Sequence, residues 1–319
     1  MSGRGTNLRI FFATDVHGSE TCFRKFINAA GAYSADAIIM GGDITGKQIA
    51  LIVQQNRGWR MGEGRDLTTF DSREGVNQAC KNLSASGLYP IVIDEAEERV
   101  LKEDRAAVEE RFRQERLDRV ESWMRLAEER LRPLGIPCYV SPGNDDDRDV
   151  ADIISSSTWA ENPEGRVVDV GGHEMISWGW SNPTPWDTPR EQSEEDLGAR
   201  LDSMAASLND PEGAIFNLHC PPFHSGLDTA PALDADLKPV VRGGHVEVKP
   251  VGSTAVRQVI DRFQPLLGLH GHVHESPGMK KIGRSMCINP GSDYRTANLR
   301  GAIVQLAPHK VTAWTLTSG

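Results

Sequence analysis

Five short apolar runs in this chain each end in a loop that carries acidic, amide or imidazole side chains. The runs are Leu8–Ala13, Ala37–Met40, Cys138–Val140, Ala214–Leu218 and Leu266–Leu269. The first two flank a helical stretch at about 20–33, and strand, helix, strand at this spacing indicates a βαβ unit with parallel strands. Ligands of open α/β sheets bind at the carboxyl ends of strands. We therefore predict an α/β sandwich whose functional loops gather at one edge.

The rest of the chain is interpreted as part of the same domain, which would span residues 1–319. Further strands are expected near Ser285–Ile288, Gly301–Leu306 and Val311–Leu316. The stretch Gly179–Glu195 is rich in Pro and Trp and is expected to form an irregular surface loop.

The segment 47–133 differs from its surroundings and is interpreted as an insertion of a hairpin-like part and a long helix. Ile49–Trp59 alternates weakly and precedes a Gly-rich turn, Gly62–Gly64. Asp94 is expected to cap the helix, with Glu97 as its capping-box partner. Unbroken, about 38 residues would give a helix of roughly 57 Å.

Two interpretations of this helix stay open. An apolar stripe at helical spacing comprises Val108, Phe112, Val120, Trp123, Ala127 and Leu131. Acidic and basic residues four positions apart elsewhere on the helix favour a solvated helix that lies along the domain. The alternative is a protruding arm that covers the site or pairs with a second copy, which would make residues 94–132 a homo-oligomer contact.

Composition excludes several classes of protein. The chain has 45 acidic and 35 basic residues, a formal net charge of -10, which argues against nucleic-acid binding. Its five cysteines are scattered without C-x-x-C spacing, which indicates reduced thiols and a cytoplasmic protein. The N-terminal MSGRGTN shows no signal-peptide core, and no apolar run is long enough to cross a membrane.

The loops after the apolar runs hold residue types that bind metals. They contain Asp15, His17, Asp43, Asn144, Asp145, Asp146, Asp147, His219, His270, His272 and His274. Each has an ordinary explanation when taken alone, since an Asp caps helices and an Asn supplies turns. Their joint placement at one predicted sheet edge is harder to dismiss, because there the groups can converge.

These loops resemble the five motif blocks of the calcineurin-like metallophosphoesterases. The blocks here are Asp15-Val-His17, Gly42-Asp43, Gly143-Asn144-Asp145-Asp146, Leu218-His219 and Gly271-His272-Val-His274, in the family order. The turn 289–292, Asn-Pro-Gly-Ser, resembles the family's C-terminal turn, and "GNDD" and "GHVHES" resemble Icc-related predicted phosphoesterases. The resemblance implies a four-layer αββα sandwich and a metal-dependent phosphoesterase.

Carried over by position, the resemblance implies a dinuclear site. The first metal would be held by Asp15, His17, Asp43 and His274, and the second by Asp43, Asn144, His219 and His272. Asp43 would bridge the two ions, and His270 would point away as a buried histidine. Such ligands suit Mn, Fe or Zn without choosing among them. Two cations roughly 3.5–4 Å apart clamp a phosphate and acidify a water, so that metal-bound hydroxide attacks a phosphomonoester or phosphodiester.

One position departs from the family pattern. Many members have a His, taken as the proton donor, where this chain has Asp145. An Asp beside two cations stays ionised and cannot donate. We therefore expect an enzyme without the usual general acid, with His224 as the nearest alternative donor, and expect Asp145→His to raise turnover of poorly activated esters. Arg148 and Arg295 are candidates for phosphate contacts, with surface salt bridges as the alternative.

A scaffold or binding protein that retains this fold without turnover is the competing hypothesis. A protein that has lost its catalytic activity should also have lost metal ligands. All seven ligand positions here hold residues that can bind a metal, which favours an active enzyme. The substrate would be a phosphate-ester small molecule or a nucleotide. Cyclic nucleotides, nucleotide anhydrides, phospholipid head groups and phosphoproteins all stay open.

Overall fold

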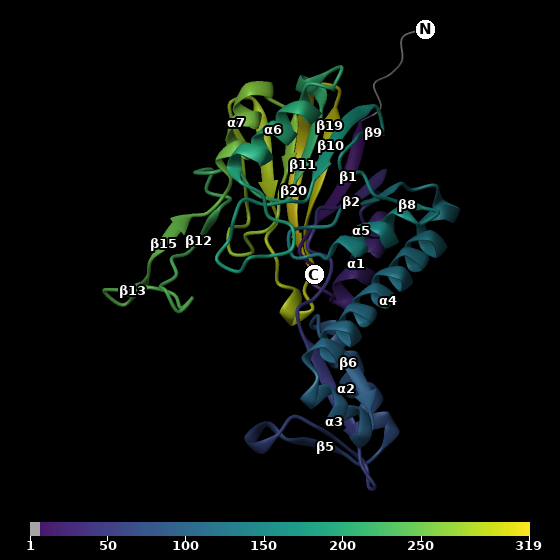
Figure 1. The fold of residues 1–319 in the computed structure, drawn as a ribbon. Coiled ribbons are helices and arrows are strands. Elements are labelled where there is room, and N and C mark those ends of the chain that lie inside the picture. The colour runs from purple at the N-terminus through teal and green to yellow at the C-terminus, as the bar shows by residue number, and fades with distance from the viewer. Residues whose placement is uncertain (1–6) are drawn as a thin grey trace.

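The computed structural model describes residues 7–319 and shows two six-stranded sheets packed face to face, with helices on both outer faces (Figure 1). These four layers confirm the predicted αββα sandwich. The N-terminal stretch examined for a signal peptide lies, up to residue 6, outside the described residues.

The first sheet contains the βαβ unit expected from the sequence. Its strands run in the order β20 (Lys310–Ser318), β19 (Arg300–Ala307), β1 (Leu8–Ala13), β2 (Ala37–Met40), β7 (Cys138–Val140) and β8 (Ala160–Glu161). β1, β2 and β7 are parallel, and α1 (Glu20–Ala32) connects the first two. Side chains alternate between the faces, so that Phe11 packs under the helices and Phe12 between the sheets.

The second sheet supplies the other loops. Its strands run in the order β17 (Gly278–Ile282), β18 (Ser285–Asn289), β16 (Leu267–Leu269), β11 (Ile215–Leu218), β10 (His173–Trp178) and β9 (Val167–Val170). The four strands from β18 to β10 are parallel and are covered by α6 (Glu194–Ala205) and α7 (Thr254–Phe263). Strands buried on both faces explain the continuous apolar runs in the sequence.

The insertion is a small folded unit rather than a hairpin and a helix alone. Its sheet has the order β5 (Thr68–Phe70), β4 (Trp59–Met61), β3 (Ile49–Gln54) and β6 (Tyr89–Ile93), with α2 (Arg73–Ala85) between β5 and β6. The predicted hairpin exists as β3–β4, but it turns at 55–58 and not at Gly62–Gly64. A core of Val53, Ile91, Ile93 and Leu101 holds this unit together.

The predicted long helix is wrong in one respect, because it breaks into α3 (Glu95–Glu103) and α4 (Arg105–Leu131). Asp104 has an extended backbone, with φ -122° and ψ 102°, and its carboxylate caps the amides of Ala106 and Ala107. A carboxylate that accepts hydrogen bonds from the following backbone amides stabilises the start of a new helix. The spacing of apolar residues does not reveal such a break. Asp94 caps α3 as expected.

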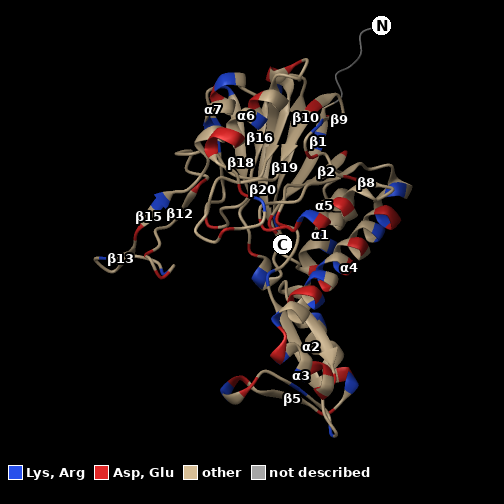
Figure 2. Cartoon of the chain, viewed as in Figure 1, with Lys and Arg blue, Asp and Glu red and all other residues tan. Residues whose placement is uncertain are grey.

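The C-terminal half of α4 lies along the first sheet, as the solvated-helix interpretation predicts. Val120, Trp123, Ala127 and Leu131 are buried, and the Trp123 ring stacks on Phe23 at 4.3 Å. Basic and acidic residues are interspersed over its exposed side (Figure 2). This part of the apolar stripe is used within the chain, and the homo-oligomer contact stays an untested prediction.

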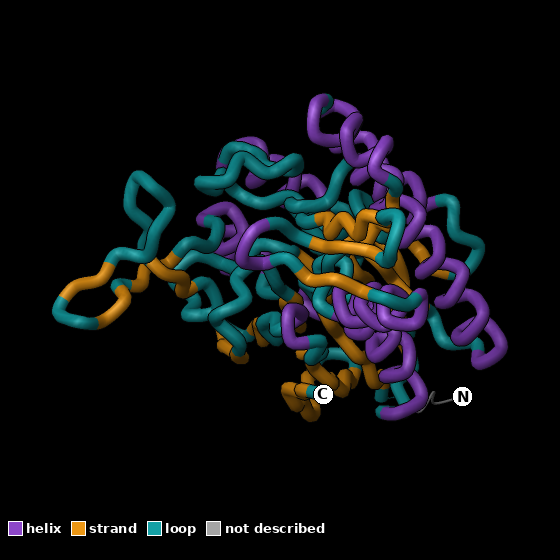
Figure 3. Tube along the Cα trace, turned by 90° about the horizontal axis from the view of Figure 1, so that it is seen from below, coloured by secondary structure: helices purple, strands orange, loops and turns teal. Residues whose placement is uncertain are grey.

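α5 (Arg148–Ser155) completes this helical layer. A long two-stranded arm, which the sequence did not indicate, leaves the other side of the molecule (Figures 1 and 3). It is built from β12 (Thr229–Pro231) with β15 (Val248–Pro250) and, at its tip, β13 (Val241–Arg242) with β14 (His245–Val246). Among residues 7–319, every helix is too short or too polar to cross a lipid bilayer.

Candidate metal centre

The predicted ligands lie at the carboxyl ends of the central strands of both sheets. Asp15, His17, Asp43 and His272 all have positive φ, between 39° and 65°. Non-glycine residues rarely adopt this conformation, and it concentrates at functional sites. Backbone hydrogen bonds hold the loops together: the Asp15 amide donates to Gly42 and the His17 amide to Asp43, at 2.9 and 3.0 Å. The loops are thus fastened to one another and not only to their own strands.

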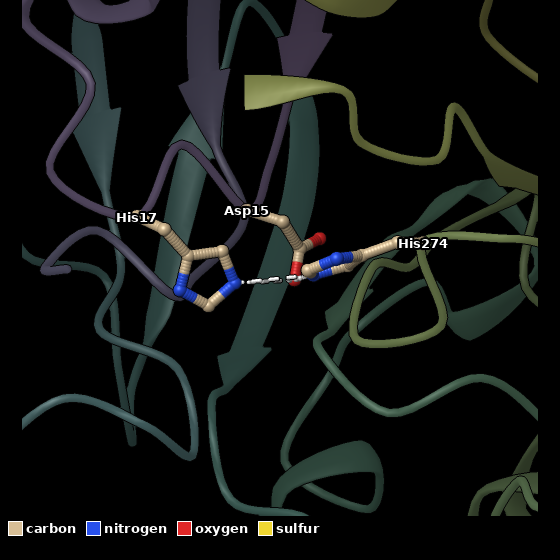
Figure 4. A group of neighbouring side chains, drawn as sticks. All are labelled: Asp15, His17 and His274. Carbon is tan, nitrogen blue, oxygen red and sulfur yellow. Dashed lines mark hydrogen bonds and ion pairs between the residues drawn. The ribbon is translucent and has the colours of Figure 1, made fainter. Parts of the chain in front are cut away.

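One group consists of Asp15, His17 and His274, whose side chains point toward a common position (Figure 4). The Nε2 atoms of His17 and His274 are 3.1 Å apart, and Oδ1 of Asp15 is 3.2 Å from Nε2 of His274. Two imidazole nitrogens that face each other at this distance match two ligands of one ion, because zinc–nitrogen bonds of about 2.0–2.1 Å place neighbouring ligands roughly 3 Å apart.

A second group consists of Asp43, His219 and His272, with Asn144 beside it. His219 Nε2 lies 3.3 Å from Asp43 Oδ1, and Asn144 Oδ1 lies 2.7 Å from His272 Nδ1. The Asn144 amide nitrogen donates to Thr188 at 2.9 Å, which turns its oxygen toward the group. The carbonyl of Gly41 lies 3.0 Å from His219 Nδ1, so that Nε2 is the nitrogen presented to the centre.

Asp43 lies between the groups. Its Oδ2 is 3.6 Å from His17 Nε2, and its Oδ1 is 3.3 Å from His219 Nε2. One carboxylate oxygen is therefore directed at each group. This is the placement that the family resemblance requires of a bridging ligand, and it follows from the turn after β2.

Charges within the cluster are strongly coupled. Burial alone would raise the pKa of Asp15 and Asp43, but the neighbouring histidines lower that of Asp15 to about 2 and hold that of Asp43 well below its ordinary value. Burial lowers the pKa of His17 to about 3, whereas at His219 burial is outweighed by Asp43, Asp15 and the Gly41 carbonyl together, which raise its pKa to about 9. The buried carboxylates and imidazoles thus shift one another's pKa values, with those of Asp15 and Asp43 lowered and that of His219 raised.

The residues fit divalent ions. Asp15 and Asp43 are 1% and 2% exposed, and in residues 7–319 neither has a Lys or Arg within ion-pair distance. Buried carboxylates are normally paired or metal-bound. Nε2 of His219 is also buried and makes no hydrogen bond of acceptable geometry, although Asp43 is close. This mixed nitrogen and oxygen set suits Mn, Fe or Zn.

Asp145 has an unexpected partner, Lys47. The Lys47 ammonium forms an ion pair with Asp145 Oδ2, which also lies 3.9 Å from His17 Nδ1. Burial and the neighbouring Asp43 raise the pKa of Asp145 to about 7, against the opposing effect of Lys47. The carboxylate next to Asn144 is thus one half of an Asp–Lys pair. The sequence gives little signal of it, since Lys47 begins the insertion and contacts Asp145 about a hundred positions away.

Asp146 is a positioning residue rather than a ligand. It is fully buried and accepts hydrogen bonds from the amides of Gly143, Ile44 and Thr45 and from the Thr45 hydroxyl, at 2.6–3.0 Å. These bonds join the Gly-Asp loop to the Gly-Asn loop, so the carboxylate supports both. Asp147 instead pairs with Arg116 of α4.

The remaining candidates lie outside the cluster. His270 is fully buried with Nδ1 2.8 Å from the Leu218 carbonyl, as expected for a structural histidine. His224 is exposed, its ring lies against Phe223, and no hydrogen bond joins it to the cluster in residues 7–319, so the structure does not support it as a proton donor. Arg148 lies over the Trp180 ring. Arg295 lines a cavity at the first group.

The insertion touches these loops closely. The Tyr89 hydroxyl accepts from the Gly46 amide at 3.1 Å, and Arg119 of α4 donates to the Gly18 carbonyl at 2.6 Å. A Cβ on Gly87 would lie 2.4 Å from the His17 carbonyl oxygen, so only glycine fits there. The insertion therefore forms a wall beside the first group.

Comparison with known proteins supports the fold. No protein-family profile matches the chain. An uncharacterized protein of Methanocaldococcus jannaschii, MJ1162, is 30% identical over 152 residues, which span 47% of this chain and 61% of that protein.

Two crystal structures superpose over 98% of this chain and 99% of theirs, with TM-scores of 0.56 and 0.52 at 14% and 15% identity. The second is TT1561 of Thermus thermophilus. At this identity the likeness concerns the fold alone.

Proposed function

We propose that this chain, which has the calcineurin-like metallophosphoesterase fold, is a metal-dependent phosphoesterase that hydrolyses a phosphomonoester or phosphodiester at a dinuclear centre. The observation that carries the proposal is Asp43, which directs one oxygen to each of two groups of buried and half-buried Asp and His residues. Asp15, His17 and His274 would complete one ion site, and Asn144, His219 and His272 the other.

The chain's own side chains would position the ions and the substrate. Two divalent ions, when bound, supply positive charge that polarises a phosphate ester and lowers the pKa of water. As a water oxygen bonds to phosphorus, the bond to the leaving oxygen breaks and that oxygen takes up a proton. Lys47 lines the cavity next to His17 and His274 and is held by Asp145, so it places a cation where developing negative charge needs one. The Asp–Lys pair would thus replace the charge of the missing histidine, though not its role as proton donor.

A direct test uses the full chain loaded with manganese, with bis-p-nitrophenyl phosphate and p-nitrophenyl phosphate as substrates. Metal content is measured in the same samples. Turnover of either ester, lost on chelation and restored by manganese, is the expected result. Absence of turnover of both esters with two ions demonstrably bound would overturn the proposal and favour the scaffold hypothesis.

A further inference from the structure

The cavity beside the first group extends well beyond the ligands themselves. It measures about 620 Å³ and is bordered by His17 and His274 at the metal centre. Its remaining lining comes from Lys47, Glu275, Pro277, from the segment after β18, namely Ser292, Asp293, Tyr294 and Arg295, and from Arg300, the first residue of β19. A single phosphoryl group at the centre would leave most of this volume to the rest of the substrate.

The segment after β18 is fastened to the metal centre. The Ser292 hydroxyl donates to the Asp15 carbonyl at 2.6 Å, and its amide donates to the His274 carbonyl at 3.3 Å. The Tyr294 ring lies against the His17 ring, with centroids 4.8 Å apart. Groups carried by this segment are therefore held at a fixed position relative to the ligands.

Among residues 7–319, neither Arg295 of this segment nor Arg300 of β19 has an acidic partner within ion-pair distance. Arg295 donates only to the Tyr294 hydroxyl, at 3.3 Å, and the Arg300 side chain makes neither a hydrogen bond nor an ion pair within residues 7–319. The cavity also contains Glu275 and Asp293, the latter accepting from Asn298. In a chain with net charge -10, guanidinium groups free of carboxylates beside a phosphate centre are a distinctive feature. Such groups bind phosphate through paired charge-assisted hydrogen bonds.

We infer that the substrate carries a second phosphoryl group on its leaving-group side, bound by Arg295 and Arg300 while the first lies at the metal centre. This inference rests on the proposed function and specifies its substrate class as a phosphate ester with a second phosphate. The Tyr294 ring between the two positions would face the part of the substrate that joins the two phosphates.

The test compares two matched esters, p-tolyl phosphate and 4-(phosphonomethyl)phenyl phosphate, on the manganese-loaded full chain. Both release a phenol, and only the second carries the additional anion, which cannot be hydrolysed. Charge-assisted bonds of this kind predict roughly a tenfold to hundredfold higher kcat/KM for the phosphonate ester. The double variant Arg295→Gln, Arg300→Gln should remove that advantage, so that the two esters are hydrolysed with equal kcat/KM. Arg242→Ala, on the distant arm, is the control and should retain the preference.

Each outcome supports or overturns the second phosphate site. Equal kcat/KM for the two esters, or a preference that survives in the double variant, would overturn the inference while leaving the proposed function intact. A carboxymethyl analogue preferred as strongly as the phosphonate would overturn the assignment to phosphate. If neither ester is hydrolysed, the proposed function fails, and calorimetric binding of the same pair to metal-loaded protein still tests the second anion site by its affinity ratio.

Discussion

The metal-centre loops and the insertion are built in opposite ways. The loops come from strands distant in sequence, are mostly buried, and are joined by long-range hydrogen bonds such as those that Asp146 accepts from Ile44 and Thr45. The insertion has its own sheet and a core of only a few side chains, and much of its surface is exposed. It reaches the site through Gly87, which lies against His17, and through Tyr89, which accepts from the Gly46 amide.

The sandwich and the insertion therefore have different roles at the site. The sandwich positions the groups that would hold ions, and it does so with backbone geometry that the insertion does not supply. The insertion adds a wall and, at its first residue, the Lys47 ammonium. Substitutions should therefore have smaller effects on metal binding and turnover as they move from the loops into the insertion.

The largest effect is expected for Asp43→Asn. The amide keeps the shape of the side chain but removes the negative charge shared by the two groups. Loss of transition-state stabilisation worth several kcal/mol corresponds to a decrease in kcat/KM on the order of a thousandfold. Metal content per chain, measured by mass spectrometry, should fall below two. Asp152→Asn, on the exposed face of α5, is the control and should retain both ions. Full metal content and turnover in Asp43→Asn would show that the carboxylate between the two groups is not needed.

Asp146→Asn tests whether the joining of the loops matters as much as the ligands. The asparagine places a donor where Asp146 accepts from backbone amides, which should loosen the contact between the Gly-Asp and Gly-Asn loops. Supporting residues of metal sites typically contribute roughly 10- to 100-fold in affinity, and we expect a loss of this size in manganese titrations. Asp147→Asn should change the affinity little, because that carboxylate pairs with Arg116 instead. Equal effects of the two substitutions would contradict a special role for Asp146.

The same division explains what could be predicted from the sequence. The strands before the ligands were predicted almost to the residue, because buried parallel strands are continuous apolar runs and each motif follows one directly. β4 and β5 have only three residues each, and β6 pairs in parallel with β3 so that Ile49 lies opposite Tyr89. Strands this short, and strands that pair across a long stretch of sequence, produce no local pattern of apolar residues. The Lys47–Asp145 pair was missed for the same reason, since it depends on where the insertion docks.

Lys47→Ala tests the contact between the insertion and the metal-centre loops. Removing the cation that we propose to face the departing oxygen should lower kcat roughly tenfold to a hundredfold for alkyl phosphates, with much less effect on p-nitrophenyl esters. The affinity for manganese should stay unchanged, since Lys47 is not among the clustered ligands. Lys281→Ala, on the exposed face of β17, serves as the control. A uniform loss across leaving groups would mean that Lys47 only maintains the shape of the cavity.

Gly87→Ala tests how closely the insertion must dock. Gly87 has φ +87°, and a Cβ there would lie 2.4 Å from the His17 carbonyl oxygen. The left-handed conformation alone costs about 1–2 kcal/mol of stability for a residue with a Cβ. Gly135→Ala shares the positive φ, at +66°, but meets no atom within 4 Å. Both variants should lose unfolding free energy in denaturant titrations, and only Gly87→Ala should also lower kcat/KM. Unchanged kcat/KM in Gly87→Ala would show that the wall is not needed.

The smallest effect is expected for Asp104→Ala, within the insertion. The Asp104 carboxylate caps two amides of α4, and loss of such a cap typically costs about 1 kcal/mol. Because α4 is anchored through Trp123 and Leu131, far from this end, the centre should retain its metal affinity and kcat/KM. Circular dichroism separates two responses: reduced helicity indicates fraying at the start of α4, whereas increased helicity would show that Asp104 is what keeps α3 and α4 apart. A loss of turnover would contradict the division of roles, because it would make the far end of the insertion part of the catalytic machinery.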